Sequence, residues 1–523
     1  MSVQGKSVAK GISVLGISGI ICKVVGVLFS IPLARILGDK GLGLFQTVFP
    51  TYNLLLTLSS AGLPVAVSRM VAHYLAKKEP RNAMRVFRLA LQILFVIGLL
   101  FSLLMFFSNH LLVRLVGVEE ASRGFRVIAP CVLIVCLLSA FRGYIQGHQN
   151  MVPTAVSQLI EQVGKVAISL PLAAIGVRRS MAEGAAGALL GITVVEILAL
   201  AYMFLYVLFH HRRTYPKSFS SHSSVPAGKL ARRLISISVP ITISACIIPL
   251  AQFIDSALMV NRMVEAGLTR DTATSLYGIF SGMVIRLINI PTALALAISM
   301  SLVPAISYAK SLEDHAAIVR ESNTGIRYAA LIGFPCSIGM SILAKPILAF
   351  FYTGTLTASR LQTASELLTV SALTVFLFTM VQATTSILQG LHYQKIPMYT
   401  MIAGVFLKVL LNYLLIGTPG IDIHGGPIAS VVCYSTAMIP NLYFCCKHGK
   451  MKFNITDWIL RPGLAAGIMG AATWGLKSLL PAGRITTVLL VAAGILIYAV
   501  AALLLKAVSK DDLTAILRRK KKS

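Results

Sequence analysis

The sequence predicts an all-α protein that crosses a membrane many times, built as two six-helix lobes followed by two further helices. Three observations support this prediction: an apolar composition, long apolar stretches, and motifs that recur at one offset. The 523 residues are 56% hydrophobic and only 12% charged, whereas soluble chains carry about 25% charged residues. Lipid must therefore cover much of the apolar surface.

Fourteen apolar stretches each approach or exceed the length of about 20 residues that a bilayer core requires. The stretch at 91–107 does not alternate in polarity, which argues against the strands of a membrane barrel. The predicted spans are residues 11–37, 44–67, 86–108, 126–147, 153–176, 185–209, 233–258, 276–307, 326–352, 366–390, 396–417, 425–446, 457–478 and 484–506.

The formal net charge is +29, and its distribution predicts the orientation of the chain. The loops on one side hold about twice as many lysines and arginines as those on the other, and the richer side is normally cytoplasmic. We therefore expect a multi-pass protein of the cytoplasmic membrane with both termini inside. Membrane topology accounts for the basic charge, so no nucleic-acid partner is expected.

Motifs recur in the two halves at a nearly constant offset, which predicts an internal duplication. The pairs, 240 to 244 residues apart, are Pro64 and Pro304, Gln146 and Gln389, Pro153 and Pro397, and Lys165 and Lys408. Six spans per copy is an even number, so the copies would be parallel repeats, an arrangement that transporters use. The expected domains are an N-terminal lobe at 1–209, a basic cytoplasmic linker at 210–232, a C-terminal lobe at 233–450, and two helices with a basic tail at 451–523.

Five bases and three acids lie within the predicted spans, where charge is costly and usually faces a partner or a watery cavity. Lys23 lies about 18 Å into its span and has no acid three or four residues away. Arg286 lies at a similar depth. Both are predicted to line a net-cationic cavity that suits a phosphate or diphosphate group, with an ion pair to another helix as the alternative. For Lys408 the two alternatives stay open.

The remaining intramembrane charges have several interpretations. Glu161 precedes Lys165 by four residues, so the two could form a structural pair on one helix face or contribute to a ligand site. Arg142 lies close enough to the cytoplasmic end of its span to reach water. Glu196, at mid-depth, could pair with a base or serve in ion coupling. Asp255, near the outer end, could also serve in ion coupling or simply be solvated.

No catalytic motif, nucleotide-binding motif or metal-ligand spacing occurs in the sequence. We therefore expect a protein that is not an enzyme and has no metal or cofactor. Pro64 and Pro304 could allow the two lobes to bend, with ordinary packing kinks as the alternative.

Two segments carry a family resemblance: SIPLARILGDKGLGLFQTVFPTYNLLLTLSSAGLPVAVSRMVA at 30–72 and FRGYIQGHQNMVPTAVSQLIEQVGK at 141–165. They resemble the polysaccharide-exporter branch of the multidrug/oligosaccharidyl-lipid/polysaccharide (MOP) exporter superfamily, especially its sporulation proteins and lipid II flippases. The resemblance covers essentially the whole chain.

The resemblance implies a flippase that moves an undecaprenyl-diphosphate-linked saccharide, such as lipid II or a related cell-wall precursor, from the inner to the outer leaflet. Alternating access would expose the headgroup on each side in turn, with Lys23, Arg286, Lys408 and Arg69 around the diphosphate. A proton or sodium gradient, or the membrane potential, would supply energy, and cell-wall synthesis enzymes would be partners. The alternatives are an ion-coupled multidrug exporter that uses Glu196 or Asp255, and a non-transporting scaffold for envelope synthesis.

Overall fold

The computed structural model describes the backbone of residues 3–214 and 225–508. Within these ranges, the side chains of residues 3–21, 23, 24, 27, 210–214, 294, 297, 298 and 300 are outside the description. The described residues form helices joined by short turns and contain no strand, as the all-α prediction requires. By its contacts the chain divides into two compact units, residues 1–282 and 283–523.

The helices of the N-terminal unit are α1 (Val3–Ser60), α2 (Leu63–Ala76), α3 (Pro80–Phe107), α4 (Asn109–Val116), η1 (Glu119–Ala121), α5 (Ser122–Gly147), α6 (Val152–Gly164), η2 (Lys165–Ser169), α7 (Leu170–Val177), α8 (Met181–Thr214), α9 (Ala227–Glu265) and α10 (Arg270–Tyr277). The π-helical turn η3 (Gly278–Val284) follows at the boundary between the units.

The helices of the C-terminal unit are α11 (Ile285–Ser311), α12 (His315–Ile342), α13 (Ala344–Tyr352), α14 (Ala358–Ser371), α15 (Leu373–Gly390), α16 (Lys395–Ile416), η4 (Asp422–His424), α17 (Gly425–Gly449), η5 (Thr456–Leu460), α18 (Arg461–Leu479) and α19 (Arg484–Leu504).

Within the described residues, 12 helical runs are long and apolar enough to cross a membrane, so the predicted number of fourteen is not confirmed. Part of the difference arises at the N-terminus, where α1 and α2 together count as one run, Leu28–Ala76. The run is not a straight rod, because Gly38 has a non-helical backbone (φ 63°, ψ −170°) that glycine adopts readily. α18 is not among the twelve.

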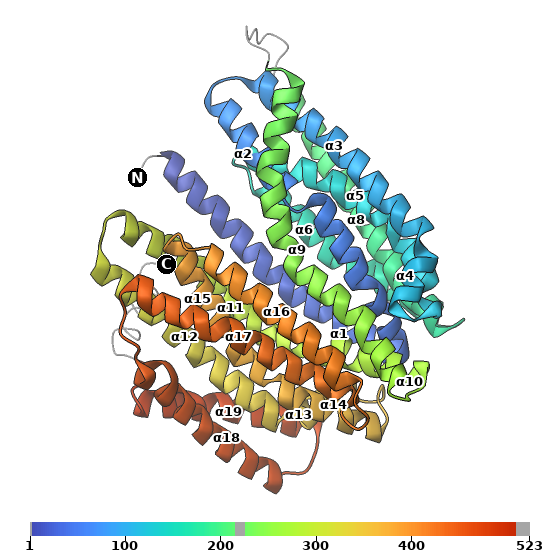
Figure 1. The fold of residues 1–523 in the computed structure, drawn as a ribbon, viewed down its shortest axis with the longest axis vertical. Coiled ribbons are helices and arrows are strands. Elements are labelled where there is room, and N and C mark those ends of the chain that lie inside the picture. The colour runs from blue at the N-terminus through green and yellow to red at the C-terminus, as the bar shows by residue number, and fades with distance from the viewer. Residues whose placement is uncertain (1–2, 215–224, 509–523) are drawn as a thin grey trace. The chain divides into compact units, whose positions relative to one another are not determined.

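The N-terminal unit is organised around α5, which packs against α2, α3 and α8 (Figure 1). Close packing depends on glycine: a Cβ at Gly143 would lie 2.7 Å from the Pro64 carbonyl oxygen. Large side chains such as Phe125 and Tyr144 are fully buried around this helix. The buried interior fixes the positions of the polar side chains that α5 carries.

The C-terminal unit is organised around α15, which packs against α11, α12 and α17. A Cβ at Gly390 would lie 2.8 Å from the Cβ of Ile306, and one at Gly147 would lie 2.6 Å from the Cβ of Val71. The glycine that ends each Gln-Gly motif therefore allows the same kind of close helix contact in both units. This similarity in packing agrees with the duplication that the paired motifs predict.

The contacts and the predicted domains differ at two places. α9 packs on α1 and α2, so contacts group α9 and α10 with the N-terminal helices, whereas the repeat assigns them to the second lobe. In the predicted linker at 210–232, α8 extends to Thr214 and α9 begins at Ala227, and residues 215–224 lie outside the described residues. The predicted boundaries stay predictions.

Candidate functional site

Four charged side chains gather inside the N-terminal unit and form the strongest candidate for a functional site. Arg142 comes from α5, Glu161 from α6, Lys165 from η2 and Glu196 from α8. Their side chains are 16%, 11%, 19% and 6% exposed, respectively. We call these four residues the buried charge cluster.

Arg142 holds one half of the cluster together. Its Nε and Nη2 atoms donate to the hydroxyl oxygen of Ser157 at 3.0 and 2.8 Å, and Nη2 also forms an ion pair with Glu161. Ser157 in turn donates to the carbonyl of Thr154 at 2.8 Å. The planar guanidinium group can contact a hydroxyl and a carboxylate together, so it connects α5 firmly to α6.

Lys165 and Glu196 form the other half, and their contact is looser. The Lys165 Nζ atom lies 3.9 Å from Oε1 of Glu196, which is beyond hydrogen-bond distance. The second oxygen of Glu196 is buried and has no hydrogen-bond partner among the described residues. Glu161 lies close enough to Glu196 for the two carboxylates to interact electrostatically. Lys165 and Glu196 are therefore held less tightly than Arg142 and Glu161.

The pairing differs from the one suggested by spacing along α6. The i, i+4 relation between Glu161 and Lys165 favoured a pair on one helix face, but Glu161 pairs with Arg142 and Lys165 faces Glu196. A π-helical turn begins at Lys165, and such a turn changes the direction in which side chains project. Arg142 is mostly buried rather than extended toward water, because Ser157 and Glu161 offer it partners inside the unit.

The segment of α1 around Lys23 passes close to the buried charge cluster. Cys22 interacts electrostatically with Glu161, Lys165 and Arg142, and a Cβ at Gly26 would lie 3.7 Å from the side-chain oxygen of Gln162 on α6. The side chain of Lys23 itself lies outside the described residues. Within the four described members, two positive charges balance two negative ones.

The other predicted site residues lie elsewhere. Arg69 is exposed on α2, and Asp255 is half-buried on α9 in the same unit. Arg286 on α11 and Lys408 on α16 are half-buried in the C-terminal unit, where α11 packs on α12 and α15 and α16 packs mainly on α17. The predicted gathering of Lys23, Arg286, Lys408 and Arg69 in one cavity stays a prediction.

The two predicted hinge prolines occupy different structural positions. Pro64 lies in the first turn of α2, directly after the break between α1 and α2, where a missing N–H costs no helical hydrogen bond. Pro304 lies inside the continuous helix α11. The structure thus puts a helix start at one proline and a helix interior at the other.

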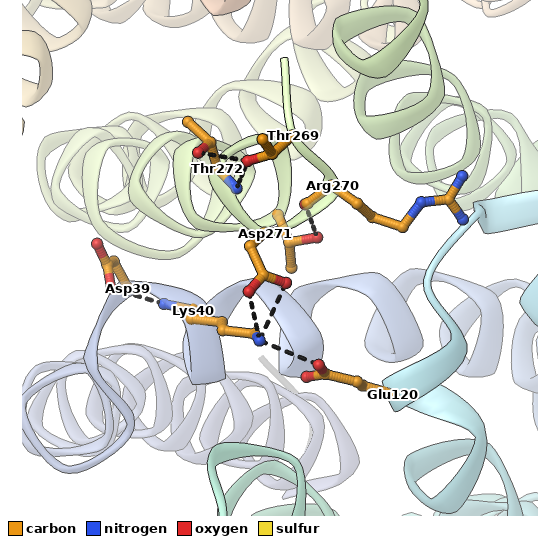
Figure 2. Close-up of polar contacts among 8 residues, drawn as sticks. Asp39, Lys40, Glu120, Thr269, Arg270, Asp271 and Thr272 are labelled. Atoms are coloured by element: carbon orange, nitrogen blue, oxygen red, sulfur yellow. Dashed lines mark hydrogen bonds and ion pairs between the residues drawn. The ribbon is translucent and has the colours of Figure 1, made fainter.

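A second charged cluster, absent from the predicted site, connects α1, η1 and α10 (Figure 2). The Lys40 Nζ atom lies 3.0 Å from Oε1 of Glu120 and 3.0 Å from the Asp271 carboxylate. Next to it, Arg270 donates to the carbonyl of Gly117. The predicted orientation places these residues on the outer side of the membrane.

Close backbone contact accompanies these ion pairs. A Cβ at Gly43 would lie 2.1 Å from the Thr274 carbonyl oxygen, and one at Gly278 would lie 2.2 Å from the Asp39 carbonyl oxygen. Further along, Gln46 donates from Nε2 to the carbonyl of Ser281 at 3.1 Å. We call this interface, between residues 39–46 of α1 and residues 270–282, the α1–α10 contact.

Sequence reasoning missed the α1–α10 contact because its partners are distant along the chain. Lys40 and Asp271 are 231 residues apart, and each looks like an ordinary loop charge when considered alone. The glycines at 43 and 278 gave the only available signal, and a glycine does not indicate which distant segment it approaches.

Comparison with known proteins places these features in a family. The family model described as "Polysaccharide biosynthesis protein" matches residues 8–310, and the MatE model matches residues 240–414. Stage V sporulation protein B of Bacillus subtilis (strain 168) is 26% identical over 512 residues, which is 97% of each chain. Lipid II flippase MurJ of the same organism is 25% identical and covers 85% of this chain and 84% of its own.

Solved structures share the fold. A structure of lipid II flippase MurJ in an inward closed conformation matches with a TM-score of 0.70, 15% identity, and coverage of 93% of this chain and 97% of that one. An inward-facing MATE family multidrug resistance transporter of the MOP superfamily matches with a TM-score of 0.66 and 15% identity, over 84% of this chain and 99% of that one. These relatives are transporters and flippases, not enzymes. The chain therefore belongs to the polysaccharide biosynthesis protein family, and it shares its fold with MurJ and with a MATE family transporter of the MOP superfamily.

Proposed function

We propose that this protein is a flippase that moves an undecaprenyl-diphosphate-linked saccharide, lipid II or a related cell-wall precursor, from the inner to the outer leaflet. The observation that carries the proposal is the buried charge cluster beside the α1 segment that contains Lys23. A charge at the centre of a membrane span costs at least about 2.5 kcal/mol on insertion scales, so such charges mark substrate or ion pathways. The similarity to a lipid II flippase supports the choice of substrate class.

The charge balance assigns different roles to the bases. Arg142 pairs with Glu161 and Lys165 lies 3.9 Å from Glu196, so a carboxylate already balances the charge of each of these two bases. Lys23 is then the base of this region that serves the diphosphate, as a point charge. Arg286 and Lys408 would contribute from the second unit.

In this proposal the α1–α10 contact is the outer gate of the alternating-access cycle. Ion pairs and interlocked backbones at this contact would close the predicted outer side while the headgroup enters from the cytoplasm. Release outside then requires residues 270–282 to separate from residues 39–46. The membrane potential can help, since each unit charge moved is worth about 2.3 kcal/mol per 100 mV; a proton or sodium gradient is the other source.

An ion-coupled multidrug exporter is the second candidate. The MatE match at 240–414 and the unsatisfied oxygen of Glu196 favour it, because a buried carboxylate can take up a proton or a cation. This candidate requires lipophilic cations as substrates and coupling through Glu196 or Asp255.

Binding measured by native mass spectrometry tests the proposal. We expect undecaprenyl-diphosphate saccharide to bind in preference to phosphatidylglycerol, and Lys23→Gln or Arg286→Gln to weaken binding by about tenfold or more, the 1.4 kcal/mol expected for one charge-assisted contact. Arg320→Gln is the matched control, because its side chain is 73% exposed. Flipping of a fluorescent analogue in liposomes should fall in parallel.

Two outcomes would contradict the proposal. One is binding that shows no preference for the diphosphate lipid over phosphatidylglycerol and is unchanged by both substitutions. The other is transport of lipophilic cations that stops in Glu196→Gln while lipid binding is absent, which would favour the exporter.

A further inference from the structure

A cavity of about 510 Å³ lies within the C-terminal unit, and its lining includes no residue assigned above to transport. α13, the start of α14 and the turn between α18 and α19 enclose it. All of these elements belong to one compact unit, and α19 packs on α13 while α18 packs on α12. The hairpin of α18 and α19 therefore forms a fixed wall of the cavity.

The charged residues that line this cavity are all basic: Lys345, Lys477 and Arg484. They come from three different helices, α13, α18 and α19. Among the described residues no acid lines the cavity, although the chain places acids beside bases elsewhere, as at Lys40. Three like charges around one space repel each other unless an anion joins them.

The contacts of the two lysines show that Lys477 is held in place and that Lys345 is held more loosely. The Lys477 Nζ atom donates to the carbonyl of Ile342 at 2.8 Å, at the C-terminal end of α12, and the side chain is partly buried. The Lys345 Nζ atom reaches the side-chain oxygen of Gln362 at 3.5 Å. Both partners are neutral, and the two ammonium groups interact with each other electrostatically. The charge is thus positioned but not neutralised by these contacts.

The rest of the lining is largely apolar and includes Phe350, Leu361, Leu480 and Leu490. A cavity for a free, fully hydrated anion would not need such walls. Bases together with apolar walls fit an amphiphile, whose phosphate contacts the bases and whose first chain segments contact the hydrocarbon side chains. The predicted topology puts the three bases at the outer end of their helices, at the depth of lipid headgroups.

We propose that this cavity binds the phosphate group of an anionic membrane phospholipid at the outer face. Lys345, Lys477 and Arg484 supply the positive charge, and the bound lipid fastens the α18–α19 hairpin to α13. This role is separate from flipping, so it can fail while the proposed flippase activity holds.

Trp474 provides a local probe. It lies three residues before Lys477 on α18 and is 67% exposed, whereas the other tryptophan, Trp458, is 1% exposed and gives a constant background. In vesicles that contain equal amounts of the brominated lipid, brominated phosphatidylglycerol should quench the Trp474 fluorescence more strongly than brominated phosphatidylcholine. We expect Lys345→Gln and Lys477→Gln, singly and together, to abolish most of this preference.

Two control variants test whether the charge and its position matter. Lys477→Arg should keep the preference because it keeps the charge, and Arg320→Gln should keep it because that base lies on α12, outside the cavity lining. Equal quenching by both lipids in the wild-type protein would overturn the proposal. A preference that survives the double substitution, or one that an excess of inorganic phosphate removes, would also overturn it, the latter in favour of a free anion.

Discussion

Arg142 and Glu161 are nearly enclosed by protein, with side chains 16% and 11% exposed, so their pairing has measurable consequences. Glu161→Gln keeps the shape of the side chain but leaves Arg142 buried without its carboxylate. Breaking a buried pair in this way costs about 3–5 kcal/mol. We expect a clearly lower unfolding temperature for the purified protein in detergent.

The matched control is Glu120→Gln, because Glu120 also pairs with a base but its side chain is 48% exposed. Exposed pairs contribute about 1 kcal/mol or less, so this variant should unfold close to the wild-type temperature. If the unfolding temperature of Glu161→Gln were as close to the wild-type value as that of Glu120→Gln, Arg142 would not depend on Glu161. A double variant, Arg142→Gln with Glu161→Gln, should recover part of the loss.

At this scale the sequence identified the charges but not their partners. The depth of Glu161, Lys165 and Glu196 in apolar stretches was visible, whereas Arg142 was expected to reach water; all four are in the buried charge cluster. The pairing of Arg142 with Glu161 was not visible, because it joins helices whose rotation depends on packing. The i, i+4 spacing rule identifies only pairs within one helix.

At the scale of elements, the α1–α10 contact depends on glycine. Gly43→Ala would place a methyl group 2.1 Å from the Thr274 carbonyl oxygen, so the two segments must separate. Such overpacking costs about 1–3 kcal/mol, which corresponds to roughly five- to hundredfold faster hydrogen exchange. We expect this increase in the amides of residues 270–282, measured by mass spectrometry.

Gly467→Ala is the control for this experiment, since a Cβ at Gly467 in α18 would meet no atom within 4 Å. Alanine favours a helix over glycine by up to about 1 kcal/mol, so this variant should exchange no faster than the wild type. Unchanged exchange at 270–282 in Gly43→Ala would mean that the α1–α10 contact does not hold that segment.

The element boundaries could be predicted only in part. Long apolar stretches indicated helices throughout, and the described residues are helical. The break in α1 at Gly38 falls in the interval 38–43 between the first two predicted spans, so the sequence located it as a loop, whereas α1 continues through this interval as a kinked helix. The count of fourteen spans was not confirmed, because α1 and α2 together count as one run and α18 is not among the twelve runs.

At the scale of the whole molecule, the distribution of basic residues predicts both termini in the cytoplasm. A green fluorescent protein fused after residue 523 should therefore fluoresce in cells, because it folds well only inside. An alkaline phosphatase fused after residue 482, in the turn between α18 and α19, should be active because that turn is expected outside. The reverse pattern would invert the orientation and move the phospholipid cavity to the inner face.

The family and fold could be predicted from the sequence because apolar stretches long enough for membrane helices occur along the whole chain, and because the segments at 30–72 and 141–165 carry specific motifs. The division into compact units was not, because the predicted repeat assigns residues 233–282 to the second lobe, whereas the contacts assign them to the first unit. Contacts depend on the conformation that a transporter adopts, whereas repeats record how the chain was assembled. The two descriptions need not agree.

Pro64 and Pro304 show what a duplicated architecture can become. One proline begins a helix after a break, where the Gly62 N–H is held by the Thr242 hydroxyl at 3.1 Å, and the other lies in an uninterrupted helix. On the duplication that the motifs predict, one ancestral position now stands beside a break between two helices in one copy and inside a continuous helix in the other. The two copies therefore differ in helix continuity at equivalent positions, and under the same force they would bend at different places.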